Sequence, residues 1–582
     1  MNKGLYSPEL HVQIIIALLK KYGIKNIIAS PGATNVSFVA SLQKDPFFSI
    51  YSAPDERSAA YIACGMAEET NKPVVITCTG ATSSRNYMPG LTEAYYRKLP
   101  ILAITASPRY MYTGHLRPQF MDRTVHPNDL VVRSVQLPEV KDKNDEWDCI
   151  IKVNQALTDL TRRSGGPVHI NYVTVYPSFD NYVESLPDIK KIEHYCYETI
   201  GNVDMPKGRI CIFVGSHLKM SEDLTNAIDR FCSVNNAVVF CDQTSGYHGK
   251  YKVPYSLVAS QALADKNLQP DLLIHIGEIS GDYYTTGKLK SAKHVCRVSE
   301  DGEIRDYFGK LSSVFEMSEL FFFEHFSNGT GKDSEYYDDC RRRIEEINKK
   351  DVDVPFSNIW VASKLYSLLP KNSVLHLGIL NSLRAWNFFE LDPSIDVYSN
   401  VGGFGIDGGM STMLGASIAS PERLFYGVFG DLAFFYDMNC LGNRHVGKNL
   451  RILLINNGKG TEFRNYSHSA APMGDDADKF VAAAGHYGNK SQDLVKHYSE
   501  DLGFKYISAN SKESFMEVYP SFVDDSVKDK SIIFEIFTDS KDESDALKAI
   551  RTIETDIKSS LSGVIKSTVK TVLPKSIIDK LR

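Results

Sequence analysis

The chain has 582 residues, too long for one ordinary domain, and its length predicts about three to five domains. Its composition is 43% hydrophobic and 23% charged, which is typical of a globular protein and excludes a disordered or fibrous chain. The net charge of -6 does not support nucleic-acid binding, and no stretch is apolar enough to cross a bilayer. Ten scattered cysteines without a CxxC pair favour a reducing cytoplasm.

Strand-like apolar runs alternate with helical patterns along most of the chain, which predicts α/β domains with parallel sheets. Four runs fall in the first block, four in the second and five in the third. They are residues 25–30, 46–53, 73–79 and 99–105, then 209–215, 236–242, 271–277 and 294–299, then 373–378, 396–400, 423–431, 450–457 and 531–538. We therefore predict domains at 1–190, 200–345 and 355–545, and a basic amphipathic tail at 546–582.

Two strands of the third block end on small polar residues, Gly430-Asp431 and Asn456-Asn457. Ligands of open parallel sheets lie beyond the carboxyl ends of the strands. A carboxylate, an amide oxygen and backbone carbonyls suit magnesium, and the adjacent helix N-terminus suits a diphosphate. The alternative, an Asp helix cap and an Asn-Gly turn, fits these residues equally well on physical grounds.

This spacing resembles the diphosphate–magnesium signature of thiamine diphosphate (ThDP) enzymes. The resemblance implies that Asp431, Asn457 and the backbone carbonyl of Lys459 bind magnesium, and that Gly430 and Leu432 lie at the cofactor. Leu432 stands where most of these enzymes have glycine, a departure found in the menaquinone-pathway branch.

Residues 53–107 resemble the cofactor-activating segment of the menaquinone-pathway synthase, which joins decarboxylated 2-oxoglutarate to isochorismate. The resemblance implies that Glu56 hydrogen-bonds N1′ of the aminopyrimidine and so favours formation of the thiazolium ylid. Taken alone, Glu56 would be interpreted as an acidic residue that stabilises its helix N-terminus, but Asp431 and Asn457 at the family's distance favour the cofactor role.

Further positions follow from the same resemblance. Residues 399–419 match the segment before the diphosphate loop, which gives Gly405 close approach to the pyrimidine and makes Ile406 the wedge beneath the cofactor. Gln119 is expected to face the reacting centre as a second catalytic residue, and Asn86 to pack near the cofactor.

The substrate positions depart from the menaquinone-pathway pattern. Thr34, Trp386 and Val401 stand where that branch has arginines that pair with carboxylates. We therefore predict a rebuilt substrate pocket in which Trp386 forms a flat wall. The candidate substrate residues are Ser30, Thr34, Arg109, His115, Ser382, Arg384, Trp386, Val401 and Arg464.

The resemblance implies three doubly wound parallel-sheet domains and an obligate homodimer or homotetramer in which Glu56 of one subunit meets Asp431 of another. We predict ThDP- and Mg²⁺-dependent decarboxylation of a 2-oxo acid, with transfer of the acyl carbanion to a small-molecule acceptor in C-branched sugar, surface polysaccharide or secondary-metabolite synthesis. The alternatives are a simple 2-oxo acid decarboxylase, a divergent menaquinone-pathway synthase and a silent scaffold subunit. The tail packs across the oligomer or lies on an anionic membrane surface.

Overall fold

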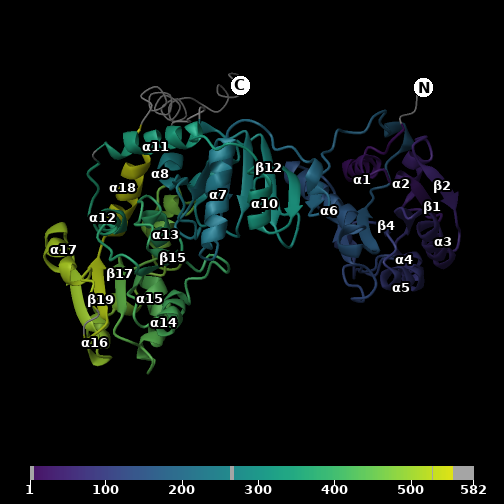
Figure 1. The fold of residues 1–582 in the computed structure, drawn as a ribbon. Coiled ribbons are helices and arrows are strands. Elements are labelled where there is room, and N and C mark those ends of the chain that lie inside the picture. The colour runs from purple at the N-terminus through teal and green to yellow at the C-terminus, as the bar shows by residue number, and fades with distance from the viewer. Residues whose placement is uncertain (1–4, 262–267, 351, 527–528, 555–582) are drawn as a thin grey trace, which may run out of the picture. The chain divides into compact units, whose positions relative to one another are not determined.

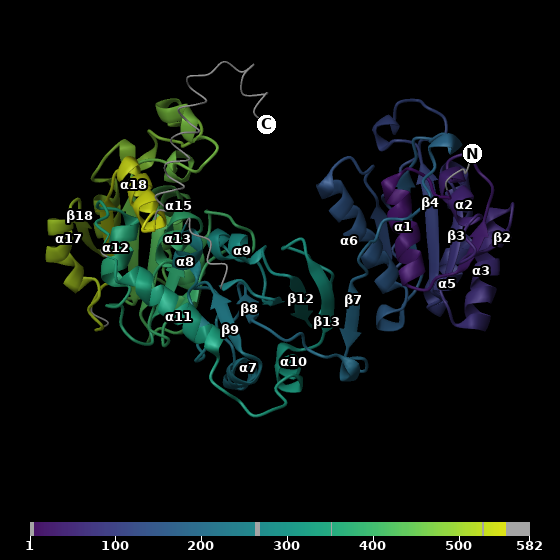
Figure 2. The ribbon, with the colours of Figure 1, turned by 90° about the horizontal axis from the view of Figure 1, so that it is seen from above.

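The computed structural model describes residues 5–261, 268–350, 352–526 and 529–554 (Figures 1 and 2). It divides into two compact units. The first comprises Met1–Asn202 and Glu300–Glu316, and the second comprises Val203–Ser299 and Met317–Arg582.

The first unit is built on a parallel six-stranded sheet of order β2-β1-β3-β4-β6-β5. The four predicted strands of this block are present, and β5 and β6 were not predicted. The strands are β1 (Asn26–Ala29), β2 (Ser49–Ser52), β3 (Val74–Thr79), β4 (Ile101–Ser107), β5 (Arg133–Gln136) and β6 (Val168–Val173). The helices are α1 (Leu10–Lys21), α2 (Val36–Leu42), α3 (Glu56–Thr70), α4 (Ala81–Asn86), α5 (Met88–Arg97) and α6 (Lys143–Asp159).

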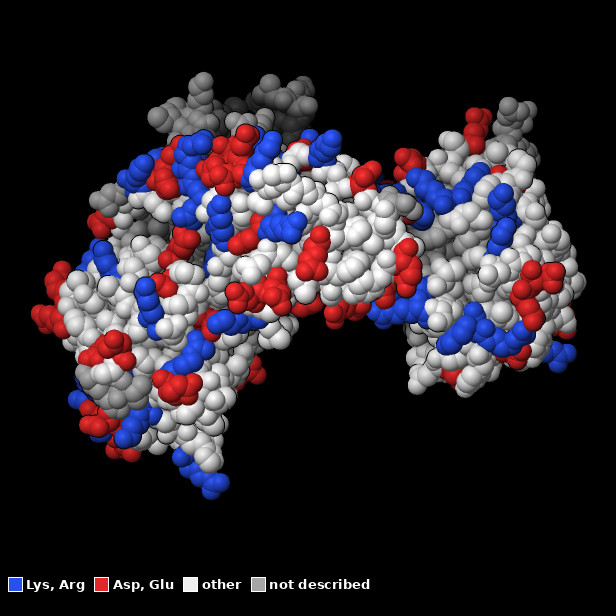
Figure 3. Space-filling view, viewed as in Figure 1, with Lys and Arg blue, Asp and Glu red and all other residues white. Residues whose placement is uncertain are grey.

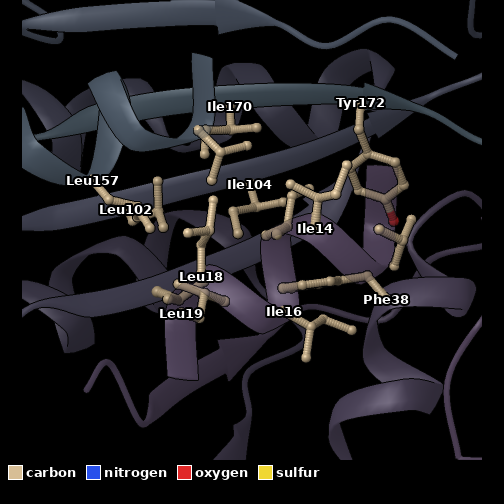
Figure 4. Close-up of a cluster of buried hydrophobic side chains, with 14 of the residues drawn as sticks. Ile14, Ile16, Leu18, Leu19, Phe38, Leu102, Ile104, Leu157, Ile170 and Tyr172 are labelled. Carbon is tan, nitrogen blue, oxygen red and sulfur yellow. The ribbon is translucent and has the colours of Figure 1, made fainter. Parts of the chain in front are cut away.

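Both faces of this sheet are covered by helices, because successive side chains of a strand point to opposite faces. Leu102 and Ile104 of β4 belong to a core with α1, α2 and α6, which Figure 4 shows. Ile101 and Ala103 of the same strand belong to a second core with α3 and α5. Figure 2 shows α1 and α6 on one side of β3 and β4, and α3 on the other. The inner strands β3, β4 and β6 are therefore buried on both faces, whereas β2 at the edge of the sheet is largely exposed.

The second unit contains two groups of parallel strands. The central group has the order β10-β9-β8-β11-β12 and includes all four predicted strands. Its strands are β8 (Ile210–Val214), β9 (Ala237–Cys241), β10 (Lys252–Val253), β11 (Leu272–Ile276) and β12 (His294–Ser299). Its helices are α7 (Glu222–Asn235), α8 (Ser256–Ser260), α9 (Tyr283–Leu289), α10 (Glu319–His325) and α11 (Glu335–Asn348). A further parallel pair, β7 (Glu193–Cys196) and β13 (Leu311–Glu316), belongs to the first unit.

The other sheet of the second unit has six parallel strands in the order β15-β14-β16-β17-β19-β18. Of these only β18, with its partly exposed pattern, was not predicted. The strands are β14 (Val374–Leu377), β15 (Asp396–Tyr398), β16 (Phe425–Gly430), β17 (Leu450–Asn456), β18 (Lys505–Ala509) and β19 (Ile532–Phe537). The helices are α12 (Asn358–Leu365), α13 (Asn381–Trp386), α14 (Gly409–Ala419), α15 (Asp431–Asp437), α16 (Leu494–Asp501), α17 (Lys512–Val518) and α18 (Ser540–Arg551). Three sets of parallel strands with interleaved helices confirm the predicted α/β class.

The start of the predicted tail needs correction. Helix α18 extends to Arg551, and its Ala546, Leu547 and Ile550 are buried. Residues 546–551 therefore belong to a packed helix, because their apolar positions recur at helical spacing on the buried face. Residues 555–582, which carry most of the predicted tail, lie outside the described residues.

The hydropathy of the helices and the distribution of charged side chains agree with what the composition predicts. Within those ranges no helix is long and apolar enough to cross a membrane. Figure 3 shows acidic and basic residues interspersed over the viewed face rather than gathered by sign. The viewed face therefore shows no continuous basic surface of the kind that binds nucleic acids.

Candidate active site

The two polar strand ends predicted to hold magnesium lie side by side. Strands β16 and β17 pair in parallel, with Gly430 opposite Ile455. Asp431 therefore follows one strand and Asn457 the next, at the same carboxyl edge of the sheet. Asp431 begins α15 and its side chain is only 4% exposed. The structure thus brings together the two residues that the spacing had singled out.

Backbone N–H groups surround the Asp431 carboxylate. The Leu432 amide donates to Oδ1 at 2.7 Å. Burial raises the pKa of Asp431 to about 6, and the backbone amides of Leu432, Gly458, Asn457 and Lys459 oppose that rise. Among the described residues no basic side chain pairs with Asp431, so its charge remains available to a cation.

The turn after β17 is shaped by both asparagines. The Thr461 hydroxyl donates to Asn457 Oδ1 at 2.7 Å. Asn456 accepts from the Gly458 amide at 3.2 Å and donates to Glu535 Oε1 at 2.7 Å. Gly458 has φ +76°, a conformation that favours glycine. No sequence motif marks the Glu535 contact, because that residue lies on β19, far along the chain.

Glu56 begins α3 because Asp55 caps the helix, accepting from the amides of Arg57 at 2.9 Å and Ser58 at 3.2 Å. The Asn86 amide donates to Glu56 Oε2 at 3.1 Å. Burial alone would raise the pKa of Glu56, but hydrogen bonds from Ser83 and Asn86 outweigh it and hold the pKa below its ordinary value. Glu56 is thus ionised at neutral pH, and Asn86 acts through it.

The remaining predicted cofactor positions, Gly405 and Ile406, lie in a turn before α14. Gly405 is exposed and follows Phe404, whose φ is +54°, and Ile406 is half-buried. A Cβ on Gly405 would lie 2.3 Å from Asp407 Oδ1, so another residue here would displace the exposed Asp407 side chain. No contact of the described residues tests the predicted wedge role of Ile406.

Gln119 and His115 lie on an exposed loop of the first unit. Gln119 has φ +69°, and neighbouring Leu116 is fully exposed. Within that unit the structure does not bring either side chain to Glu56. Their predicted substrate roles therefore depend on what covers this loop.

Ser30 and Thr34 are buried in the first unit. The Thr34 hydroxyl contacts Thr79, donates to the Ala106 carbonyl at 2.8 Å and accepts from the Gly80 amide at 3.3 Å. It thus links neighbouring strand ends, and its hydrogen-bonding capacity is already used. The structure gives Thr34 an internal role in place of the predicted substrate contact.

The predicted flat wall at Trp386 is wrong for this structure. Trp386 is 1% exposed and Val401 2% exposed, so both are core residues. Val401 lies beside Gly281 and Leu383. Ser382 is also buried, 3.5 Å from the Asn358 amide nitrogen. The reason is the packing of α13, whose Ser382, Leu383, Ala385 and Trp386 are all buried, and even Arg384 has a side chain only 13% exposed.

The basic residues predicted at the substrate pocket are each paired with an acid. Arg109 makes two bonds to Glu139, at 2.9 and 2.7 Å, in the first unit. In the second unit Arg384 pairs with Glu462 at 2.8 and 3.0 Å. Lys459 and Arg464 share Asp478, at 2.5 and 3.1 Å, and Arg464 also contacts Asp475 at 2.9 Å. The sequence did not reveal these acids, since no motif marks them.

A hollow of about 700 Å³ lies in the second unit, bordered by α8, α9, α18 and the loop at Tyr466. Tyr284 lines it, and the charges of Arg384, Arg551 and Glu462 act on the Tyr284 hydroxyl, whose pKa is raised chiefly by burial. Arg551 lies over the Tyr284 ring at 5.2 Å and Lys548 over the Tyr466 ring at 5.7 Å. The hollow is also lined by Tyr466 and Ser467, which follow the Thr461–Arg464 turn that carries Glu462.

Comparison with known proteins agrees with this geometry. Residues 11–126 match the thiamine pyrophosphate enzyme N-terminal TPP-binding domain, where thiamine pyrophosphate (TPP) is the same compound as ThDP. A 2-succinyl-5-enolpyruvyl-6-hydroxy-3-cyclohexene-1-carboxylate synthase of Flavobacterium johnsoniae is 31% identical over 482 residues, 79% of this chain and 85% of the relative. The synthase of the same name from Bacteroides fragilis is 29% identical, covering 94% of this chain and 99% of the relative.

The fold, the strand-end acids and the matched domain define a thiamine diphosphate-dependent enzyme. Within that class the chain belongs to the family of the 2-succinyl-5-enolpyruvyl-6-hydroxy-3-cyclohexene-1-carboxylate synthases. Its residues fit the cofactor: Asp431 is a buried acid that no basic side chain of the described residues pairs with, and Glu56 is an ionised acid held by neutral donors.

Proposed function

We propose that the protein decarboxylates a 2-oxo acid and transfers the resulting acyl carbanion equivalent to an acceptor, using ThDP and Mg²⁺. The C1–C2 bond of the donor breaks, CO₂ leaves, and the electron pair stays on C2, which then bonds the acceptor carbon. When bound, ThDP supplies the electron sink for that pair. The single observation that carries the proposal is the pair of acids without basic partners among the described residues, Glu56 and Asp431.

Each residue has a defined part in this proposal. Asp431, Asn457 and the Lys459 carbonyl would hold Mg²⁺, with hard oxygen ligands that this ion prefers. The amides at the start of α15 would bind the diphosphate. Glu56 would hold a proton between its carboxylate and the cofactor pyrimidine, and Asn86 keeps that carboxylate oriented through its 3.1 Å bond.

The hollow beside Tyr284 supports transfer to an acceptor over simple protonation, because it offers space for a second substrate near the turn that carries Glu462. The acceptor class we favour is a small carbonyl compound of C-branched sugar, surface polysaccharide or secondary-metabolite synthesis. A simple decarboxylase would release only an aldehyde.

The test measures CO₂ release from a panel of 2-oxo acids with ThDP and Mg²⁺, with and without aldehyde acceptors. We expect release from at least one acid, and a loss of about 10²–10⁴-fold in Glu56→Gln, the size of a general acid–base contribution. A coupled product establishes ligation, and aldehyde alone establishes the decarboxylase. ThDP binding without turnover of any acid would contradict the proposal.

A second candidate is the reaction for which the relatives are named, favoured by the 29–31% identity over most of the chain. Consumption of 2-oxoglutarate that depends on isochorismate would establish it. The pairing of Arg109, Arg384 and Arg464 with acids argues against this substrate pair, which brings several carboxylates.

We further propose a homodimer or homotetramer that is cytoplasmic, with each active site shared between subunits. The helix that begins at Glu56 exposes Tyr61 and Ile62, each 48% exposed, and the helix that begins at Asp431 exposes Tyr436 at 61%. Leu116 and Met111 on the Gln119 loop are exposed as well. Apolar side chains grouped beside functional residues are typical of surfaces that a partner covers.

A further inference from the structure

Segments that follow three neighbouring strands meet at one edge of the third sheet. Strands β14, β16 and β17 are adjacent, and the segments after them carry Arg384, Asp431 and Glu462 respectively. Thr461, the residue before Glu462, donates to Asn457 Oδ1 at 2.7 Å. The Arg384–Glu462 pair therefore lies one short turn from the proposed magnesium ligand, where a donor bound at the cofactor would extend.

The pair has the geometry that an arginine would use for a substrate carboxylate. Arg384 Nη1 donates to Glu462 Oε2 at 2.8 Å and Nη2 to Oε1 at 3.0 Å. Nη1 also donates to Asn381 Oδ1 at 2.8 Å, and Asn465 donates to Glu462 Oε2 at 2.9 Å. The side chains are 13% and 21% exposed. A two-pronged bond of this kind occupies the face of the guanidinium that recognises carboxylates.

The neighbouring bases are neutralised in the same way. Asp478 bonds both Lys459 and Arg464, and Asp475 bonds Arg464 again. Three bases thus face three acids around the turn that follows β17. Two of the cations that line the nearby hollow, Lys548 and Arg551, lie instead over tyrosine rings. Within the described part of the chain neither forms an ion pair with an acid, unlike the bases around the turn that follows β17.

We propose that Glu462 is a specificity-determining residue that makes the enzyme select donors whose only carboxylate is the one released as CO₂. This inference rests on the proposed function and names the donor class for the same site. A donor with a second carboxylate would meet Glu462 as a like charge in a partly buried pocket, or would have to displace it from Arg384. A donor with an uncharged side chain meets a pair whose charges already cancel.

The experiment compares two donors of equal carbon number, 2-oxopentanoate and 2-oxoglutarate, by kcat/KM for CO₂ release. We expect the wild type to prefer 2-oxopentanoate by about tenfold or more. Glu462→Gln frees the Arg384 guanidinium and should move the ratio toward 2-oxoglutarate by about tenfold, mostly through KM, the size of a charge-assisted contact. The double variant Glu462→Gln/Arg384→Gln should lose that gain, since the freed cation is gone.

Binding measurements separate this inference from the proposed function. The affinities of the same two acids are measured by calorimetry in a Glu56→Gln background with ThDP and Mg²⁺, with Glu462 intact or replaced. The same tenfold shift in preference toward 2-oxoglutarate is expected there. If no acid releases CO₂ but binding shows this shift, the proposed function fails and this inference stands.

Three results would overturn the inference. One is a wild type that prefers 2-oxoglutarate, which needs no variant and decides the matter even if Glu462→Gln does not fold. Another is a Glu462→Gln variant with an unchanged donor ratio, as a purely structural pair between α13 and the Thr461–Arg464 turn would give. The last is a double variant that keeps the gain for 2-oxoglutarate, since the gain would then not come from Arg384.

Discussion

The acids predicted at the cofactor and the bases near the predicted substrate pocket differ in whether they are paired with a side chain of opposite charge. Asp431 and Glu56 are held by amides, a hydroxyl and a carboxamide, and among the described residues neither has a basic partner. Arg384, Lys459 and Arg464 each have at least one carboxylate partner. The negative charge of the two acids is thus available to a metal ion and to a cationic ring, whereas the positive charge of the bases near the predicted substrate pocket is neutralised.

The contrast separates two kinds of constraint within one family. The cofactor contacts depend on groups near the ends of strands, so the fold itself places them. The substrate contacts depend on which side chains later segments bring against them. A family resemblance therefore carries over to Asp431 and Glu56 more securely than to the substrate residues.

The largest effect is expected at Asp431, the acid proposed to bind the metal. We expect Asp431→Asn to reduce CO₂ release to background, at least about a thousandfold, because loss of an outer-shell partner of a metal ligand alone costs about 10–100-fold. ThDP affinity at saturating Mg²⁺ should fall as well, measured by calorimetry. The exposed Asp501 supplies a control, and Asp501→Asn should leave both quantities unchanged. Full activity in Asp431→Asn would remove Asp431 from the site.

Mixing two inactive variants tests whether the two acids act across subunits. In a dimer assembled randomly from Glu56→Gln and Asp431→Asn chains, half the dimers carry one intact shared site. Activity should therefore return to about a quarter of the wild type after the subunits are exchanged. Each variant treated alone in the same way is the control. No recovery despite proven exchange would place both acids of a site in one chain.

Trp386 sharpens the substrate side of the comparison. Because it is almost fully buried, we expect Trp386→Ala to lower the free energy of unfolding by about 3–5 kcal/mol. Trp147 is 42% exposed, and Trp147→Ala should cost much less. Thermal or denaturant unfolding measures both. A stable Trp386→Ala protein with a raised KM would restore the substrate wall that the structure argues against.

Two glutamates near the end of the described chain, Glu543 and Glu554, show the same dependence of the pKa on whether a basic side chain is paired with the acid. Burial raises the pKa of Glu543 to about 7, against the hydrogen bond from the Asn358 backbone amide. Arg343 and then Lys350 lower the pKa of Glu554 to about 2 despite its burial. The folded protein therefore keeps a proton on Glu543 between pH 4.5 and 7, so this stabilising contribution is lost as the pH rises through 7.

Replacing each of these glutamates by glutamine tests the two pKa shifts through the pH dependence of stability. Relative to the wild type, Glu543→Gln should gain stability between pH 5 and pH 8, by up to about 3 kcal/mol at about 1.4 kcal/mol per pKa unit. Glu554→Gln should be destabilised to the same extent at both pH values, because its contribution is lost only as the pH falls below 4.5 toward 2. Parallel melting curves at the two pH values decide it, and identical trends for the two variants would contradict these assignments.

The sequence by itself determined the class of fold and the cofactor edge. Periodicity located thirteen strand-like runs, and all of them appear as strands. Strand ends at Asp431 and Asn457 could be predicted as neighbours because parallel strands bring their carboxyl ends to one edge. Glu56 at the start of its helix follows from the local Asp55 cap. These features depend on residues close together in sequence or on the general geometry of parallel sheets.

Only the tertiary structure decided the state of the substrate residues. Arg384 meets Glu462 across 78 positions, and Thr34 meets Ala106 across 72. Whether Trp386 faces a ligand or the core depends on how α13 packs, which its six residues do not specify. Pairing and burial at these positions come from contacts between distant segments, so no local pattern records them. For the same reason the charge of the substrate pocket was decided by acids such as Glu462 and Asp478 that no motif had marked.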